Sequence, residues 1–151
     1  MNQTIYSPQD VLAESATPQA LVEMTYRLIS FSAGGEPSWP TFRTLFSDRA
    51  VLAIRILPED PSITVMNLDE YVQWQIREGM KEAGYEERPL ERSFNVMGDL
   101  AEAHVRFQMY IGPRHIGDAI DIFQIVRKEG RWWIVSIVSE IFRDQSTTQG
   151  Q

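Results

Sequence analysis

The chain of 151 residues contains no cysteine and only two histidines. Without cysteine it has no disulfide framework, no thiolate metal site and no cysteine nucleophile. No stretch approaches the roughly 18 consecutive apolar residues of a membrane helix. Residues 1–10 also lack the basic segment followed by an apolar core that is typical of a signal peptide. We therefore expect a cytoplasmic protein that does not bind membranes.

Basic residues are scarce as well. The 14 lysines and arginines stand against 21 aspartates and glutamates, a net charge of −7, and the acids are spread along the chain. Such a surface repels phosphate backbones, so we expect no nucleic-acid partner. His104 and His115 have no carboxylate at metal-ligand spacing, which argues against a metal site. The sequence has no phosphate-binding glycine loop, nucleophile elbow or serine triad, and we expect no cofactor.

Apolar residues make up 43% of the chain, which suits a single domain over residues 1–151. We expect its core at about 18–142 and mobile tails at 1–6 and 144–151. The first part predicts helices: a capped turn at 7–14, an amphipathic helix from Pro18 to near Gly34, and a short helix capped by Ser38.

The rest of the chain predicts mostly strands. After a strand at 51–57, Asn67 and Glu70 form a capping box that starts a helix over 67–83. Trp74 lies on the far side of this helix, either exposed or covered by a loop or a partner. From Arg88 onward we expect four strands, divided at 98–99, 112–117 and 129–130. Helices followed by strands predict an α+β domain with the helices on one face of an antiparallel sheet.

Reflecting residues across the turns predicts which face of the sheet each strand residue uses. In the strand that follows the turn at 112–117, the even-numbered residues 120–126 are predicted on the apolar face that the helices cover. The odd-numbered set fits this face less well, because it includes Asp121. The same face then continues to the odd-numbered residues 133–141. Across Gly98-Asp99 the expected opposite pairs are Val96 with Ala101, Phe94 with Ala103, Arg92 with Val105, and Leu90 with Phe107.

The opposite face of the sheet mixes polar and apolar residues. Its apolar patch is larger than a soluble monomer usually exposes. We therefore predict a homodimer that forms through this face. The expected interface residues are Arg106, Tyr110, Phe123, Trp132, Ile134 and Val138.

The order of elements, the segment Trp39–Asp48 that runs into strand 50–57, and the closing segment Phe123–Ile134 resemble the nuclear transport factor 2-like (NTF2-like) superfamily. This superfamily includes SnoaL-like proteins and ketosteroid isomerases, and the resemblance covers about residues 18–142. It implies a cystatin-like cone, in which a strongly curved antiparallel sheet wraps around about three N-terminal helices and leaves a cavity at the wide end. It also implies that many members dimerise, often through the sheet.

The resemblance also directs attention to two possible catalytic residues. In isomerase-like members an aspartate on the first strand acts as the general base, but residues 50–56 of this chain contain no carboxylate. Their second carboxylate lies in a segment similar to Ile120–Phe123, so Asp121 could donate a hydrogen bond to a developing oxyanion. The predicted register instead turns Asp121 outward, toward Arg106 or His104, unless a bulge or a one-residue slip reverses it. His104 could act as a general base, as in dehydratase-like members, if it faces the cavity.

A few polar residues could anchor a ligand in the cavity. Tyr26 is a candidate on the first helix, and it could equally be a core residue whose hydroxyl is satisfied. Arg92, Gln124 and Ser139 interrupt the apolar face and need a partner, water or a ligand, since burying them unpaired is unfavourable. Alternatively, Arg92 reaches solvent at a strand end and Gln124 bonds the backbone. Arg55 is a weaker candidate.

Three functions are compatible with these features. The first is binding of a small, largely apolar or amphipathic molecule in the cone. The second is an acid/base isomerase, dehydratase or cyclase that uses Asp121 or His104. The third is a non-catalytic homodimeric interaction module. We place binding first and the enzyme second, because the first strand lacks a carboxylate.

Overall fold

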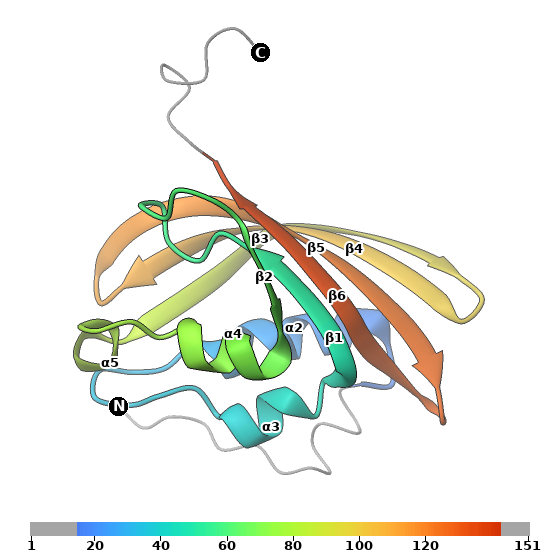
Figure 1. Cartoon of the computed structure of the whole chain (residues 1–151). Helices are drawn as coiled ribbons and strands as arrows, with labels where there is room; N and C mark the ends of the chain where they lie inside the picture. Colours follow the sequence, from blue (N-terminus) through green and yellow to red (C-terminus); the bar gives the residue numbers. More distant parts are fainter. Residues whose placement is uncertain (1–14, 143–151) are drawn as a thin grey trace, which may run out of the picture.

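A six-stranded sheet arches over a layer of helices (Figure 1). The computed structural model describes residues 15–142. In chain order the elements are α2 (Pro18–Ile29), α3 (Trp39–Arg43), β1 (Phe46–Ile54), β2 (Thr64–Asn67), α4 (Leu68–Trp74), α5 (Met80–Ala83), β3 (Tyr85–Met97), β4 (Leu100–Ile111), β5 (Arg114–Lys128) and β6 (Arg131–Ile141). The turn predicted at 7–14 and the tails predicted at 1–6 and 144–151 lie outside the described residues.

The strand order is β2-β1-β6-β5-β4-β3. All neighbours are antiparallel except β1 and β6, which run parallel, so the sheet is not purely antiparallel as predicted. β1 ends at Ile54 and β6 begins at Arg131, so the pair is not a hairpin and is free to run parallel. β1 begins at Phe46, five residues before the predicted strand start at Val51, and the short strand β2 was not predicted.

Local capping chemistry sets where the helices begin. The Thr17 hydroxyl accepts a hydrogen bond from the Ala20 N–H, with Pro18 at the first helical position of α2. The predicted capping box is confirmed at α4, where Asn67 and Glu70 exchange two bonds of 2.8 Å. The helix predicted over 67–83 is nevertheless divided into α4 and α5. The break includes Gly79 at φ 90°, a left-handed conformation that glycine adopts without strain.

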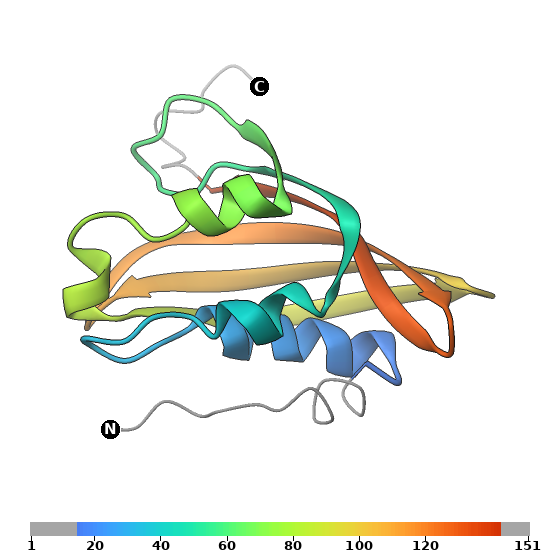
Figure 2. The ribbon, with the colours of Figure 1, turned by 60° about the horizontal axis from the view of Figure 1, so that its bottom comes forward.

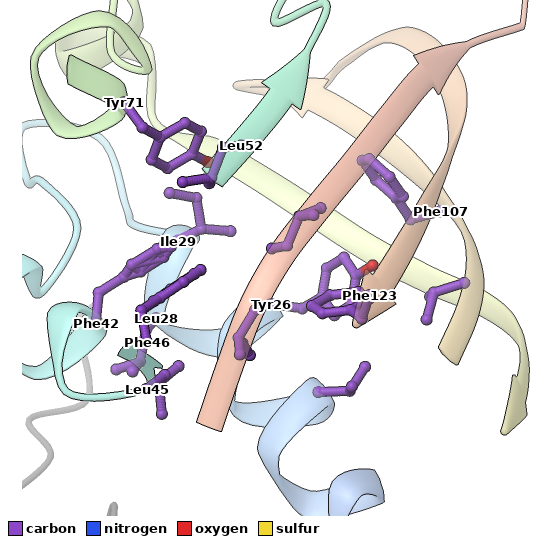
Figure 3. Packing of buried hydrophobic residues seen from close by; sticks show 14 of the residues in the cluster. Tyr26, Leu28, Ile29, Phe42, Leu45, Phe46, Leu52, Tyr71, Phe107 and Phe123 are labelled. Atoms are coloured by element: carbon purple, nitrogen blue, oxygen red, sulfur yellow. The ribbon is translucent and has the colours of Figure 1, made fainter. Parts of the chain in front are cut away.

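The core lies between the helices and the concave face of the sheet (Figures 2 and 3). α2 packs mainly on β3, and α4 packs on β1 and β2. One side of α2 is buried, as expected for an amphipathic helix, with Leu21, Met24 and Leu28 at most 1% exposed. Each of these side chains contributes about 1.5–3 kcal/mol through burial. Trp74 is 57% exposed, on the far side of α4 as predicted.

The β3–β4 hairpin confirms the predicted register only near its turn. Val96, Phe94 and Arg92 lie opposite Ala101, Ala103 and Val105 as expected, but Phe107 faces Pro89 instead of Leu90. The extra residue is a β-bulge, which shifts every earlier residue of β3 to the other face. Glu87 therefore lies opposite Met109, on the inner face.

The predicted register of β5 is wrong by one residue. Asp121 lies opposite Val105, and Phe123 lies opposite Ala103, so the odd-numbered residues occupy the inner face. The prediction moved the strand by one position to keep a carboxylate out of the core. The structure keeps the apolar partners together and buries Asp121 with them, at 7% exposure.

A second bulge changes the inner face of β6. Ile125 lies opposite Ile134, whereas Gln124 lies opposite Ser136, so Val135 is the extra residue. Ile137, Ser139 and Ile141 point inward as predicted, because the bulge cancels the register error in β5.

Three of the expected interface residues are therefore misplaced. Phe123, Trp132 and Ile134 are at most 4% exposed in the chain's own core, so they cannot form a dimer contact. Arg106 and Val138 are exposed on the outer face, and Tyr110 is half-buried there.

Candidate functional site

A small cavity lies between the helices and the inner face of the sheet. Its volume is about 30 Å³, enough for a few water molecules. Apolar side chains from α2, α3 and four strands form most of its wall, including Ile29, Phe42 and Phe107. The polar residues of the lining are Thr25, Arg55, Tyr71, Gln75, Glu87, Asp121 and Ser139.

Asp121 is the carboxylate that β5 contributes to the cavity. The Tyr26 hydroxyl donates a hydrogen bond of 2.8 Å to its Oδ2 atom, and Ser139 of β6 also hydrogen-bonds the carboxylate. Burial raises the pKa of Asp121 to about 6, although both hydrogen bonds favour the ionised form and act in the opposite direction. Burial followed by the Asp121 charge raises the pKa of Tyr26, so its hydroxyl remains a donor.

Glu87 of β3 is a second carboxylate on the inner face of the sheet, and it also lines the cavity. The Tyr85 hydroxyl donates a hydrogen bond of 2.7 Å to its Oε2 atom. The backbone N–H of Glu87 donates to the Ser30 hydroxyl at 3.1 Å, which ties this part of β3 to the end of α2. Burial and then the negative charge of Asp121 raise the pKa of Glu87 to about 8.

The two carboxyl groups thus differ in protonation at neutral pH. With pKa values of about 6 and about 8, Asp121 is mainly ionised and Glu87 mainly protonated at pH 7. Arg55 is the one basic side chain of the lining, and it is already engaged. Its Nε donates to Glu140 at 2.9 Å, and its Nη1 donates to the Asp60 carbonyl at 2.8 Å. The cavity therefore holds one base and one acid without a free counter-cation among its lining residues.

The structure brings together some of the predicted site residues. Arg55 and Ser139 line the cavity, and Tyr26 reaches it through its hydrogen bond to Asp121. The outward placement of Asp121 is corrected, because the residue belongs to the cavity wall. Figure 3 shows Tyr26 beside Phe107 and Phe123, with ring centroids 5.5 and 6.0 Å apart.

Other predicted site residues lie elsewhere. Gln124 is exposed on the outer face, where it accepts a hydrogen bond from Ser136, because the register of β5 differs by one residue. Arg92 has the expected register but lies on edge strand β3, and its guanidinium binds Glu23 of α2 at 2.7 and 2.8 Å. His104 lies on the outer face, 3.2 Å from Glu102, and does not reach the cavity.

Sequence reasoning missed Glu87, Tyr71 and Gln75. Glu87 is hidden in the charged run 86–88, which reads as a solvated segment. A signal for its placement was nevertheless present in Pro89, since proline inside a strand marks an edge or a bulge. Tyr71 and Gln75 lie four residues apart, so they share one face of α4. Within residues 15–142 no three histidine, aspartate or glutamate side chains form a group that could hold a metal ion.

No helix among the described residues is long and apolar enough to cross a membrane.

Comparisons with known proteins define the class of fold. No protein-family model matches the chain, and no curated protein matches it. Solved structures do. An NTF2-like protein of unknown function from Pseudomonas putida is 19% identical, with a TM-score of 0.65 over 92% of this chain and 93% of that one. An NTF2-like protein with a cystatin-like fold from Novosphingobium aromaticivorans is 11% identical, with a TM-score of 0.67 over 93% and 90% of the two chains.

A third structure, an NTF2-like protein of unknown function from Silicibacter pomeroyi, is 20% identical, with a TM-score of 0.59 over 91% of this chain and all of that one. The chain is thus an α+β protein whose curved sheet covers its helices and encloses a cavity. Its fold is the NTF2-like, cystatin-like fold, as the sequence predicted. These similarities define the fold and leave the activity to be argued from the cavity.

Proposed function

We propose that the protein is an acid/base enzyme that moves a proton next to the carbonyl group of a small, largely apolar molecule. One observation carries this proposal: the carboxyl groups of Asp121 and Glu87, from different strands, line one cavity, and burial raises the pKa of both. Paired acids whose surroundings separate their pKa values are a common arrangement for general acid/base catalysis. An ion pair built for stability would instead place a cation beside each carboxylate.

The chemistry follows from the two protonation states. The Asp121 carboxylate accepts a proton from the carbon beside the carbonyl, and the electrons of the broken C–H bond form a C=C bond. The carbonyl oxygen becomes an enol as Glu87 gives it a proton. In a ketone with a β,γ double bond, protonated Asp121 returns its proton to the γ-carbon while the enol O–H returns its proton to Glu87, which gives the conjugated isomer. In a ketone with a β-hydroxyl group, Asp121 instead gives the proton to that hydroxyl, which leaves as water while the enol O–H proton returns to Glu87. Each proton transfer of this kind contributes about 10²–10⁴-fold to a rate.

The lining limits the substrate. Its volume of about 30 Å³ holds only water in this structure, so even a small organic molecule requires movement of the side chains that line it. The apolar wall favours a neutral compound, because an anion would meet the charge of Asp121 with Arg55 already bound to Glu140. A small neutral ketone, for which the lining side chains move apart, is the substrate class that this wall favours.

Deuterium exchange tests this proposal without knowledge of the natural substrate. Cyclopentanone is incubated with the protein in D₂O, and loss of its α-proton signals is followed by NMR. We expect protein-dependent exchange that falls at least about 100-fold in Asp121→Asn. Asp118→Asn is the matched control, since Asp118 lies on the same strand with an exposed side chain paired to His115. Exchange that survives Asp121→Asn, or binding of the ketone without any exchange, would contradict the proposal, and the second result would favour a binding protein.

A further inference from the structure

Two polar side chains that line the cavity, those of Tyr71 and Gln75, make no side-chain hydrogen bond among residues 15–142. Tyr71 is 5% exposed and Gln75 is 2% exposed. The other tyrosines near the site are engaged, Tyr26 with Asp121 and Tyr85 with Glu87. Buried polar groups nearly always find a partner, in the protein, in water or in a ligand. Among the described residues no fully enclosed side-chain nitrogen or oxygen lacks a partner, so these two groups are open to the cavity, where water or a bound molecule pairs with them.

Helical geometry sets both groups on one side of the cavity. The Gln75 N–H donates to the Tyr71 carbonyl at 2.9 Å, so the helical turn continues through Gln75. Residues i and i+4 then project from the same helix face. α4 packs on β1 and β2, whereas Asp121 belongs to β5 in the middle of the sheet. The two unpaired groups thus face the cavity from the helix layer, and the base faces it from the sheet.

The Tyr71 ring is held in place by its aromatic neighbours. It stacks on Phe42 at 5.9 Å between ring centroids and meets Trp39 edge-on at 6.2 Å. Figure 3 shows Tyr71 projecting from α4 toward the sheet. A hydroxyl on a fixed ring is a preorganised donor, which loses little conformational freedom when a ligand binds.

The electrostatics of the cavity keep this hydroxyl protonated. Burial raises the pKa of Tyr71, and the charges of Glu87 and then Asp121 raise it further. Tyr71 therefore offers an O–H donor at neutral pH. The Gln75 amide offers N–H donors beside it.

We propose that Tyr71 and Gln75 form a two-donor subsite that binds one oxygen acceptor of the ligand. The assignment rests on the proposed function, in which that oxygen belongs to the substrate carbonyl. Tyr71 and Gln75 hold the oxygen toward α4, and the adjacent C–H bond then faces Asp121. The subsite selects against molecules of the same shape without an acceptor, because they leave two buried donors unsatisfied.

A pair of probes of equal shape tests the subsite. Cyclopentanone carries the oxygen acceptor, and methylenecyclopentane replaces it with CH₂. Binding of each is measured by titration of isotope-labelled isoleucine methyl signals, since Ile29, Ile137 and Ile141 line the cavity. We expect the wild-type protein to bind the ketone at least about tenfold more tightly, which is the discrimination of one unsatisfied buried donor.

Variants remove the donors and keep the packing. Tyr71→Phe retains the ring, and Gln75→Met retains the length of the side chain. We expect the double variant to lose the preference for the ketone while its affinity for the alkene is unchanged, whereas structural damage would weaken both. Tyr110→Phe and Gln124→Met make the same substitutions on the outer face and should keep the preference. A preference that persists in the double variant, equal binding of both probes by wild type, or binding of neither would overturn the subsite.

Asp121→Asn separates this inference from the proposed function. We expect the variant to keep the preference for the ketone and to lose proton exchange. Exchange that depends on Asp121 without any preference for the ketone would refute the subsite and leave the acid/base function in place. A preference that depends on Tyr71 and Gln75 without exchange in wild type would leave the subsite and refute the enzyme.

Discussion

The two faces of the sheet treat carboxylates in opposite ways. On the outer face Glu86 pairs with Arg88 at 3.0 Å, and both side chains are about half exposed, at 47% and 50%. On the inner face the next residue, Glu87, accepts a hydrogen bond from Tyr85, and the charge that raises its pKa is that of another carboxylate, Asp121. Burying a carboxyl group without a cation is unfavourable for folding. The comparison teaches that the inner acids are buried without an ion-pair partner and have raised pKa values, on which the proposed acid/base function depends, whereas the outer acids form ion pairs at the surface.

The largest difference between the faces is expected from truncation of their apolar residues. Phe123 is completely buried on the inner face of β5, and Val138 is 48% exposed on the outer face of β6. We expect Phe123→Ala to lower the free energy of unfolding by about 3–5 kcal/mol. Val138→Ala should change it by less than about 0.5 kcal/mol. Urea unfolding measures both, and equal effects would show that the inner and outer faces of β5 and β6 are wrongly assigned.

The pH dependence of stability gives an intermediate effect. Glu87 has a raised pKa in the folded protein, about 8 against 4.5 for a free glutamate, so the folded state holds its proton more tightly than the unfolded state. Its contribution to stability is complete below about pH 4.5 and is lost as the pH rises through about 8. The side-chain amide of Glu87→Gln does not ionise, so the variant keeps this contribution at high pH. We expect the variant to gain at least about 1 kcal/mol relative to wild type between about pH 4 and about pH 9.

Glu86→Gln is the control for this titration, since it alters the neighbouring residue on the opposite face. Thermal unfolding across the pH range measures both variants. Parallel curves for Glu87→Gln and wild type would mean that Glu87 titrates as a solvated residue.

The smallest effect is expected at the edge of the sheet. Arg92 and Glu23 form an ion pair whose side chains are about one-third exposed. A double-mutant cycle of Arg92→Ala and Glu23→Ala should give a coupling free energy of about 0.2–1 kcal/mol. Deuterium exchange into cyclopentanone should be unchanged, because neither residue lines the cavity. A large loss of exchange would instead show that Arg92 takes part in ligand binding, as the sequence suggested.

Local chemistry made much of the fold predictable. The capping box at Asn67 and the turn at Gly98-Asp99 depend on residues close together in the chain, and both are confirmed. The helix over 67–83 was predicted as continuous because its apolar spacing continues past Trp74, although the backbone breaks before α5. The resemblance supplied the curvature and the cone, which periodicity alone does not determine.

The candidate site was less predictable because β-bulges set it. Each bulge adds one residue to one strand and moves all residues on one side of it to the other face. The bulge between Pro89 and Arg92 turns Glu87 inward, and the bulge at Val135 brings Ile134 into the core. Asp121 was misplaced for a different reason, since the assumption that a charged residue avoids the core fails where the site needs it. Tyr71 and Gln75 become recognisable only when the partners of every buried polar group are known.

Titration of the carboxyl groups tests the central claim most directly, namely that Asp121 and Glu87 share the cavity with separated pKa values. The carboxyl ¹³C signals of aspartate and glutamate are followed by NMR as the pH is raised, with Asp121→Asn and Glu87→Gln used to assign them. We predict one signal that titrates near pH 6 and is lost in Asp121→Asn, and another near pH 8 that is lost in Glu87→Gln. In Asp121→Asn the remaining Glu87 signal should titrate at lower pH, because the charge that raises its pKa is gone. Ordinary titration of every carboxyl group below about pH 5 would contradict the account.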